Sequence, residues 1–304
     1  MAPCHLMPVP GTLAGTIRAL LVHDTRGLTP PPMPALERWP ALPTFMLRWV
    51  WAAPDGAASR SSLAAELVSA ELWGPQTQPL VEPLRWPALQ LCVMLWPDAL
   101  RPHLRAPVAD WVDQRGPAAA ALNMPLPAWP AFMASGPDGR SGLQHLIDWT
   151  RTWADPHRPP RPLPLGPWLD ELSGDGHTGG AARSERQRRR RLMAITGQPM
   201  RQLRASERAE RAFHAAVLGR ASGDLRWMTV ANDSGFSDQA HLCRDTLRLT
   251  GLSPDALRRS MLQDEGAWVF RLWARAGGVA SSPAARPRAH AAGASTSGLR
   301  AVGG

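Results

Sequence analysis

Residues 234–254, SGFSDQAHLCRDTLRLTGLSP, constrain the fold of this chain more than any other stretch. Gly235 permits a backbone turn with positive φ, which other residues resist, and the large apolar Phe236 follows it directly. A helix begins after this turn and stops at Gly251, with Pro254 just beyond, a typical helix-stop pattern. The stretch therefore predicts two helices joined by a tight turn, with Phe236 holding them at a fixed angle.

The second predicted helix has one packing face and one outward face. Ser237 is a good N-cap residue for it. Leu242, Leu249 and Thr246 are expected to point back toward the first helix. The outward face is predicted to hold the polar residues Asp238, Gln239, His241 and Arg244.

This arrangement is typical of a helix-turn-helix, whose second helix enters the major groove of DNA with its first residues against the base edges. Gln239 could pair bidentately with adenine, and Asp238 could accept from cytosine N4. His241 and Arg244 lie one turn further along, where contacts with phosphate are the natural role. Ser237 completes the predicted set of DNA contacts from this helix.

The positive charge of the chain is concentrated in its last third. Residues 1–180 hold 13 Arg and 15 acidic residues, whereas residues 181–275 hold 18 Arg and 10 acidic residues. Such a distribution is typical of a protein that binds a polyanion, with a solvated basic face as the alternative. Lys and Tyr are both absent, which excludes a phosphate-loop lysine, a Schiff-base enzyme and a tyrosine recombinase.

The hydropathy pattern divides the chain into a β-rich front and a helical end. Compact apolar runs at 45–53, 66–74 and 88–96 predict buried strands, and 141–155 predicts a helix. We predict an α+β protein, with a small β-rich domain followed by an all-α domain. The expected segments are a flexible Pro-rich arm (1–40), the β-rich domain (41–155), a Pro-rich linker (156–166), the helical domain (167–275) and a disordered tail (276–304).

Residues 229–259 resemble the second helix-turn-helix of the AraC family (AraC/XylS type) of bacterial transcription regulators. The positions that match its motif are Gly235, Phe236, Asp238, His241, Leu242, Arg244, Thr250, Gly251, Ser253 and Pro254. Thr246 departs from the pattern, because many members carry Phe there. Residues 72–104 show a fainter resemblance to the small β-rich domain that precedes the DNA-binding domain in one branch, which implies a role in sensing or oligomerisation.

The family carries a second copy of the motif upstream, and residues 184–200, SERQRRRRLMAITGQPM, resemble its recognition helix. Ser184 matches the cap, and Thr196 and Gly197 match the helix end. The predicted DNA contacts of this copy are Arg186, Gln187 and Arg190. Arg188 falls where the family has an apolar core residue, so this copy could contact phosphates more than bases, and an unspecific basic run remains the alternative. Residues 200–218 predict a linking helix between the two copies.

The resemblance implies a transcription regulator that binds double-stranded DNA and is not an enzyme. It leaves open a small-molecule effector, a homodimer and, for an activator, contact with RNA polymerase. We expect no metal, cofactor or membrane span. Three Cys without C-x-x-C spacing and no signal-peptide pattern predict a cytoplasmic protein. Two rival hypotheses are an enzyme with a catalytic front domain and a helical module that binds protein.

Overall fold

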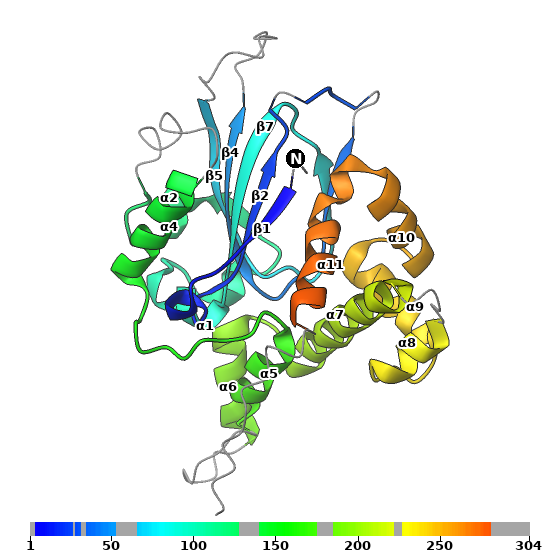
Figure 1. The fold of residues 1–304 in the computed structure, drawn as a ribbon. Coiled ribbons are helices and arrows are strands. Elements are labelled where there is room, and N and C mark those ends of the chain that lie inside the picture. The colour runs from blue at the N-terminus through cyan, green and yellow to red at the C-terminus, as the bar shows by residue number, and fades with distance from the viewer. Residues whose placement is uncertain are drawn as a thin grey trace, which may run out of the picture.

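A six-stranded antiparallel sheet forms one part of the computed structural model, and helices pack on both of its faces (Figure 1). The structure describes residues 4–26, 28–31, 35–52, 66–127, 140–174, 185–221 and 227–280. The strand order is β1-β2-β7-β4-β5-β8, and a separate two-stranded ribbon pairs β3 with β6. The bounds are β1 (Cys4–Met7), β2 (Ile17–Asp24), β3 (Leu36–Trp39), β4 (Phe45–Ala52), β5 (Glu66–Trp73), β6 (Leu80–Pro83), β7 (Ala88–Leu95) and β8 (Arg115–Pro117).

The described helices connect the sheet and form the second part of the chain. Short helical pieces follow β7, as the Pro-broken sequence predicts, and a short one also lies between β1 and β2: η1 (Gly11–Leu13), α1 (Pro97–Leu100), η2 (Arg101–His103), η3 (Val108–Trp111) and α2 (Ala118–Ala121). The longer helices are α4 (Arg140–Trp153), α5 (Leu165–Ser173), α6 (Glu185–Thr196), α7 (Met200–Ala221), α8 (Trp227–Asp233), α9 (Gln239–Thr250), α10 (Pro254–Gln263) and α11 (Trp268–Ala280), with η4 (Glu265–Ala267) before α11. Among these helices, none is both long and apolar enough to span a membrane.

The strands β4 and β7 are buried on both faces because each face of the sheet is covered by a helix. In β7, Leu91 and Val93 belong to the core that includes Leu146 of α4. Cys92 and Met94, which alternate with them, pack with Trp268 and other residues of α11. The runs that predict strands at 45–53, 66–74 and 88–96 are confirmed by β4, β5 and β7, and the two covered faces explain why β4 and β7 are largely apolar.

The predicted flexible arm over residues 1–40 is wrong for the part that the structure describes. β1, β2 and β3 all lie within it, and β2 pairs with β7 in the middle of the sheet, with Leu20 opposite Val93. The frequent prolines of this region suggested disorder, but the apolar run from Ile17 to Val22 has a buried place between two strands. The predicted tail is also too long by five residues, because α11 continues to Ala280.

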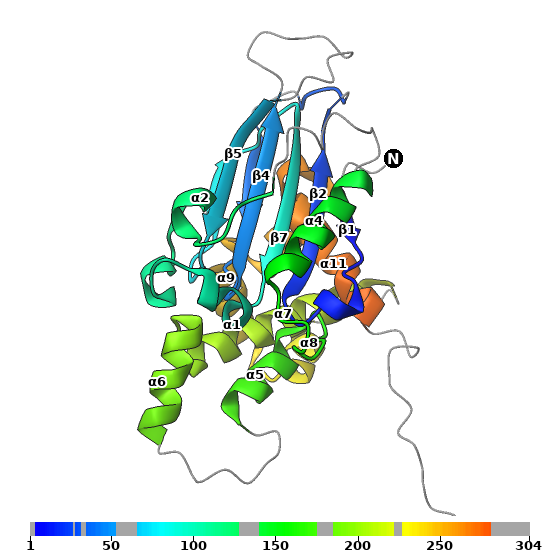
Figure 2. The same ribbon diagram turned by 90° about the vertical axis from the view of Figure 1, so that its left-hand side faces the viewer.

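The helical part does not form a separate unit, because its last helix, α11, packs on the sheet. Trp268, Val269 and Leu272 of α11 are buried in one core with residues of β1, β2, β4 and β7. Helices α5, α6 and α7 lie at one end of the strands, as two perpendicular views show (Figure 1, Figure 2). The β-rich and helical parts are both present as predicted, and they share a hydrophobic core through α11.

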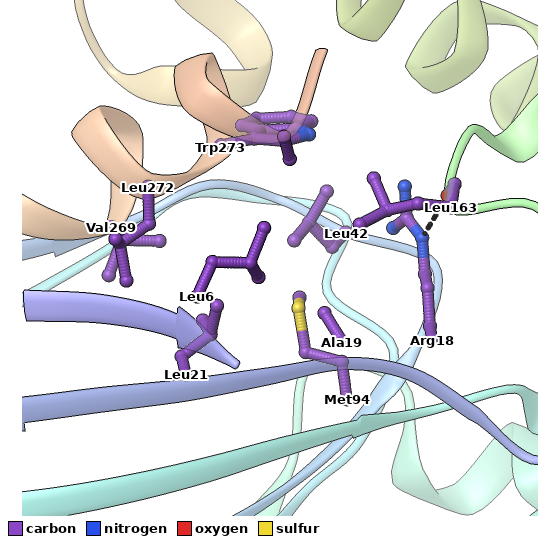
Figure 3. A pocket seen from close by; sticks show the side chains of 11 residues that line it. Leu6, Arg18, Ala19, Leu21, Leu42, Met94, Leu163, Val269, Leu272 and Trp273 are labelled. Atoms are coloured by element: carbon purple, nitrogen blue, oxygen red, sulfur yellow. Dashed lines mark hydrogen bonds between the residues drawn. The ribbon is translucent and has the colours of Figure 1, made fainter. Parts of the chain in front are cut away.

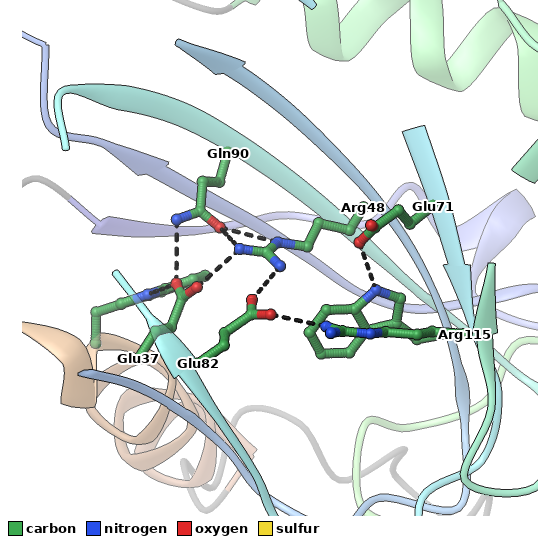
Figure 4. A network of polar contacts seen from close by, with 8 residues as sticks. Glu37, Arg48, Glu71, Glu82, Gln90 and Arg115 are labelled. Atoms are coloured by element: carbon green, nitrogen blue, oxygen red, sulfur yellow. Dashed lines mark hydrogen bonds and ion pairs between the residues drawn. The ribbon is translucent and has the colours of Figure 1, made fainter. Parts of the chain in front are cut away.

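A buried polar network connects this helix to four strands (Figure 4). Arg48 of β4 donates to Gln90 of β7 over 2.8 and 3.0 Å and to Glu37 of β3 over 2.8 Å. It also pairs with Glu82 of β6, while the indole of Trp268 donates to Glu37. Because buried charges are costly unless they are paired, the network fixes the positions of β3, β6 and α11 on the sheet.

His23 lies beside this network and is fully buried. Its ring stacks on Trp268, with the centroids 4.6 Å apart. Burial, with smaller effects from Arg271 and Arg48 that outweigh the opposing effect of Asp24, lowers the pKa of His23 to about 4. The imidazole is therefore neutral in the folded protein at neutral pH.

This depressed pKa predicts that His23 makes folding sensitive to acid. In the unfolded chain the histidine takes up a proton near pH 6.5, whereas the folded protein resists protonation until about pH 4. The free energy of unfolding should fall by up to about 3 kcal/mol between pH 6.5 and pH 4 because of this group alone. Urea unfolding of the wild type and His23→Phe at pH 7.5 and 4.5 measures the effect. The variant keeps the ring stack and should lose less stability on acidification, and an equal loss in both proteins would contradict the assignment.

Candidate nucleic-acid interface

Helices α8 and α9 form the helix-turn-helix that the sequence predicts. Gly235 has φ of 78°, so the turn requires the conformational freedom of glycine at this position. The N–H of Phe236 donates to the carbonyl of Ala231 over 2.9 Å and closes the turn. The Phe236 side chain is buried with Val230, Ala231 and Leu242, so it fixes the angle between the two helices as predicted.

The helix α9 begins at a different residue from the one predicted. Asp238, not Ser237, is its N-cap, and its Oδ1 accepts from the N–H of His241 over 2.6 Å. The Ser237 hydroxyl donates to Oδ2 of the same carboxylate over 3.0 Å. The hydrogen bond from the His241 N–H, followed by that from Ser237, lowers the pKa of Asp238. Both residues are common N-caps, and here Asp238 takes the position while Ser237 supports it.

His241, which was predicted to face outward, is half-buried. Its ring meets Phe236 edge to face at 5.1 Å, and its Nδ1 lies 3.2 Å from the Ser237 hydroxyl. Its Nε2 lies 3.6 Å from Asp245, which is mostly buried. His241 therefore lies at the flank of the helix, with 31% of its side chain exposed.

A charged cluster holds α9 against the long helix α7. The Arg208 guanidinium of α7 lies 3.6 Å from Asp245. It also lies 5.8 Å from the ring centroid of Phe236, within the range of a cation–π contact. Leu242 and Leu249, whose inward direction was predicted, are also buried on this side. The rotation of α9 about its own axis is thus fixed by both apolar and charged contacts.

The opposite face of α9 is open to solvent. Gln239 and Arg244 are exposed, as predicted. Ala240 and Leu247 are exposed as well, and with about 100° of rotation per residue they lie opposite Leu242 and Leu249. The sequence interpretation missed these two residues because it looked for polar side chains. The helical period, counted from the packing residues, would have found them.

The helix α6 ends in the same way as α9. Each has 12 residues, and each ends in Thr-Gly, with Thr250 following Thr196 by 54 residues. The Thr196 hydroxyl donates to the carbonyl four residues earlier over 2.9 Å, as that of Thr250 does over 2.7 Å. Each hydroxyl also accepts from the N–H two residues later, and both glycines have positive φ, 66° at Gly197 and 73° at Gly251. The two helices are therefore structural repeats over their C-terminal ends.

The first halves of the two helices differ. All residues from 185 to 191 of α6 are exposed, including the predicted contacts Arg186, Gln187 and Arg190. Arg188 takes the place that buried Leu242 has in α9, and it pairs with Glu185 over 3.0 Å. The predicted cap Ser184 lies outside the described residues. Burial of α6 starts at Leu192, which packs in a cluster with residues of α1, α5 and α7.

The sheet domain holds the ends of both helices. The N–H of Ala41, just after β3, donates to the carbonyl of Leu249 in the last turn of α9 over 2.8 Å. A Cβ at Gly251 would lie 3.4 Å from Pro79, and one at Gly197 would lie only 2.5 Å from a methyl of Val112. Both Thr-Gly turns therefore pack directly against loops of the β-rich domain.

A buried carboxylate on α7 connects the same two parts of the chain. Glu210 accepts from Arg18 of β2, and its other contacts are the N–H of Leu165 and the indole of Trp273, both at 2.9 Å. Arg18 also donates to the carbonyl of Leu163 over 2.9 Å. The side chains of Arg18 and Glu210 are each 2% exposed, so this ion pair is sealed from water.

An apolar cavity lies between the sheet and α11 (Figure 3). It has a volume of about 30 Å³, enough for a water molecule but far below the several hundred Å³ of a typical ligand site. Leu6, Leu42 and Leu272 line it, and Arg18 lies at one end. Trp49, Trp51, Trp73 and Trp96 are buried in the cores. In the part of the chain that the structure describes, no group of three or more His, Cys, Asp or Glu residues could hold a metal ion.

Comparison with known proteins gives a distant structural likeness. No family model and no curated protein matches the chain. Among solved structures, an apo form of ToxT from Vibrio cholerae strain SCE256 shares 10% identity, covering 78% of this chain and 95% of that chain with a TM-score of 0.36. ToxT from Vibrio cholerae O395 shares 10% identity over 73% and 95%, with a TM-score of 0.34. ToxT is an AraC-family regulator, but identities and TM-scores this low do not assign the present chain to that family.

The sealed Arg18–Glu210 pair predicts a large effect on stability. Glu210→Gln keeps the shape and an acceptor for Leu165 but leaves the Arg18 charge buried without a carboxylate. The free energy of unfolding should drop by about 3–5 kcal/mol in urea titrations. Adding Arg18→Met to the variant removes the uncompensated charge and should restore most of the loss. If the double variant were as unstable as Glu210→Gln alone, the charge pair would not be the cause.

Proposed function

We propose that the protein is a sequence-specific transcription regulator of the AraC kind that inserts α9 into the major groove of duplex DNA. The observation that carries the proposal is the exposed face of α9 with Arg244, on a helix whose rotation is fixed by Phe236 and Asp245. A helix held rigidly by one side and open on the other has the form that base readout needs.

The proposed contacts from α9 have different roles. The exposed side chain of Gln239 is suited to pair with adenine, while Arg244 contacts phosphate or a base edge. Asp238 and Ser237 fix the start of the helix and approach the DNA at its N-terminal end. His241 flanks these contacts, and it donates to a phosphate when its ring turns away from Ser237 or Asp245.

The helix α6 is proposed to bind the same DNA mainly through phosphates. Arg186, Gln187 and Arg190 are all exposed, and Arg186 and Arg190 lie one turn apart on one face. An exposed arginine-rich helix adds affinity that falls steeply with salt. The structural repeat of the Thr-Gly ends supports the interpretation of α6 as a second recognition helix instead of an unspecific basic run.

The β-rich domain is proposed to sense an effector or to form a homodimer, and the protein to act in the cytoplasm without enzymatic activity. Cys4, Cys92 and Cys243 are free thiols, which suits a reducing compartment. Because the cavity beside α11 is small, an effector at that place would have to displace α11 or Leu42. If the protein is an activator, RNA polymerase is the expected partner.

Binding to DNA can be tested with the full chain and a random duplex library at two salt concentrations. The selected duplex should be bound more weakly by Arg244→Ala, and the slope of log affinity against log salt should fall by about 1 if Arg244 contacts a phosphate. Gln239→Ala should cost about 1–3 kcal/mol, mainly at one base pair. Arg151→Ala, at an exposed site on α4, is the matched control and should leave binding unchanged. The absence of any salt-sensitive binding would favour a helical module that binds protein.

A further inference from the structure

Two large apolar side chains are exposed on the proposed recognition helices. Leu247 of α9 is 53% exposed and Met193 of α6 is 40% exposed. Exposed apolar residues are common one at a time on protein surfaces, so exposure alone explains nothing. Their positions in the two helices are what require an explanation.

Leu247 and Met193 occupy equivalent positions of the structural repeat. Each lies three residues before the Thr that ends its helix, and each backbone carbonyl accepts from the Gly of the Thr-Gly turn, over 2.8 Å from Gly251 and 2.9 Å from Gly197. Arginine also occurs at equivalent positions, at 190 and 244, three residues before each apolar side chain. Residues three apart are neighbours on a helix surface, so both helices present an arginine beside an apolar group.

In α9, Leu247 lies at the middle of the open face and not at its edge. The packing residues Leu242 and Leu249 lie on the opposite side of the helix, and Ala240 is almost in line with Leu247 on the open side. The small side chain of Ala240 allows a bound surface to approach the helix closely. A partner that lies along the whole open face of α9 therefore contacts Leu247 directly.

The charges around Leu247 and Met193 favour DNA as the surface that they meet. Arg244 is exposed next to Leu247, and Arg186 and Arg190 are exposed on the face of α6 that holds Met193. A cationic surface with an apolar centre is complementary to the major groove, which offers acidic phosphates at its rims and one apolar group, the C5-methyl of thymine, on its floor.

We propose that Leu247 and Met193 read thymine methyl groups at two places in the DNA site. This inference rests on the proposed function and adds to it two residues that determine specificity through apolar contact. Arg244 and Arg190 hold the helices in the groove, and the apolar side chains then distinguish thymine from bases without the methyl group. Each contact would exclude water from one methyl group and one side chain.

The experiment replaces each thymine of the selected duplex, one at a time, by deoxyuridine, which lacks only the methyl group. For the wild-type full chain, roughly 3- to 5-fold weaker binding is expected at the thymine that Leu247 meets and at a different one that Met193 meets. Leu247→Ala should bind the parent duplex more weakly and lose its sensitivity at the first position only. Met193→Ala should lose it at the second only. Leu262→Ala, on α10 and 56% exposed, is the matched control and should keep both sensitivities.

The outcomes separate this inference from the proposed function. If the wild type binds no duplex in a salt-sensitive way, the proposed function fails and the inference fails with it. If the wild type binds but no deoxyuridine weakens binding, only the inference is overturned. The inference is also overturned if Leu247→Ala and Met193→Ala keep the full sensitivity of the wild type. Both side chains are on the surface, so circular dichroism and urea unfolding of the variants should match the wild type.

Discussion

The buried pair of Arg18 and Glu210 is the contact on which the arrangement of the two parts of the chain depends. Its carboxylate comes from α7, the longest of the described helices, and it contacts β2, the first residue of α5 and α11. A charge so deeply buried tolerates no partial contact, because an unpaired ion inside the protein is far more costly than an unpaired one in water. The helical part is therefore held in one position on the sheet, and Trp268 and Leu272 complete the apolar core of that position.

This attachment also affects the placement of α6 and α9, the two proposed recognition helices. In a separate helical domain, α7 alone would set their relative placement. Here the sheet domain also holds the last turn of α9, through Ala41, and the end of α6, through Val112. Leu42 lines the cavity under α11, and the preceding residue, Ala41, donates the hydrogen bond to Leu249 of α9. The cavity and the end of α9 are therefore connected through two adjacent residues. The geometry that would select a DNA site is thus distributed over both parts of the chain.

The sequence predicts those features that depend on neighbouring residues. The strands β4, β5 and β7, the turn at Gly235 and the end of α9 at Gly251 follow from local apolar runs and glycines. β2 was missed because prolines on both sides hid an apolar run whose partner, β7, is far along the chain. Asp238 and not Ser237 is the N-cap of α9, and because Ser and Asp are both favoured there, the sequence does not fix the first residue of the helix to within one position. Arg18 and Glu210 are separated by 192 positions, and no pattern within either segment connects them.

The helices α6 and α9 share their C-terminal ends but differ in how firmly they are packed. Both have the same Thr-Gly end and an arginine followed three residues later by an apolar residue on the open side, whereas Ala240 of α9 is replaced by Arg186 in α6. They differ on the inner side, where Leu242 packs under α9 but Arg188 stands in the solvent on α6. A rigid helix can distinguish bases because its side chains have fixed positions, whereas a less firmly packed, highly charged helix gains affinity from phosphates of any sequence. Under the proposed function, this difference on the inner side makes α9 the main source of specificity and α6 the main source of affinity.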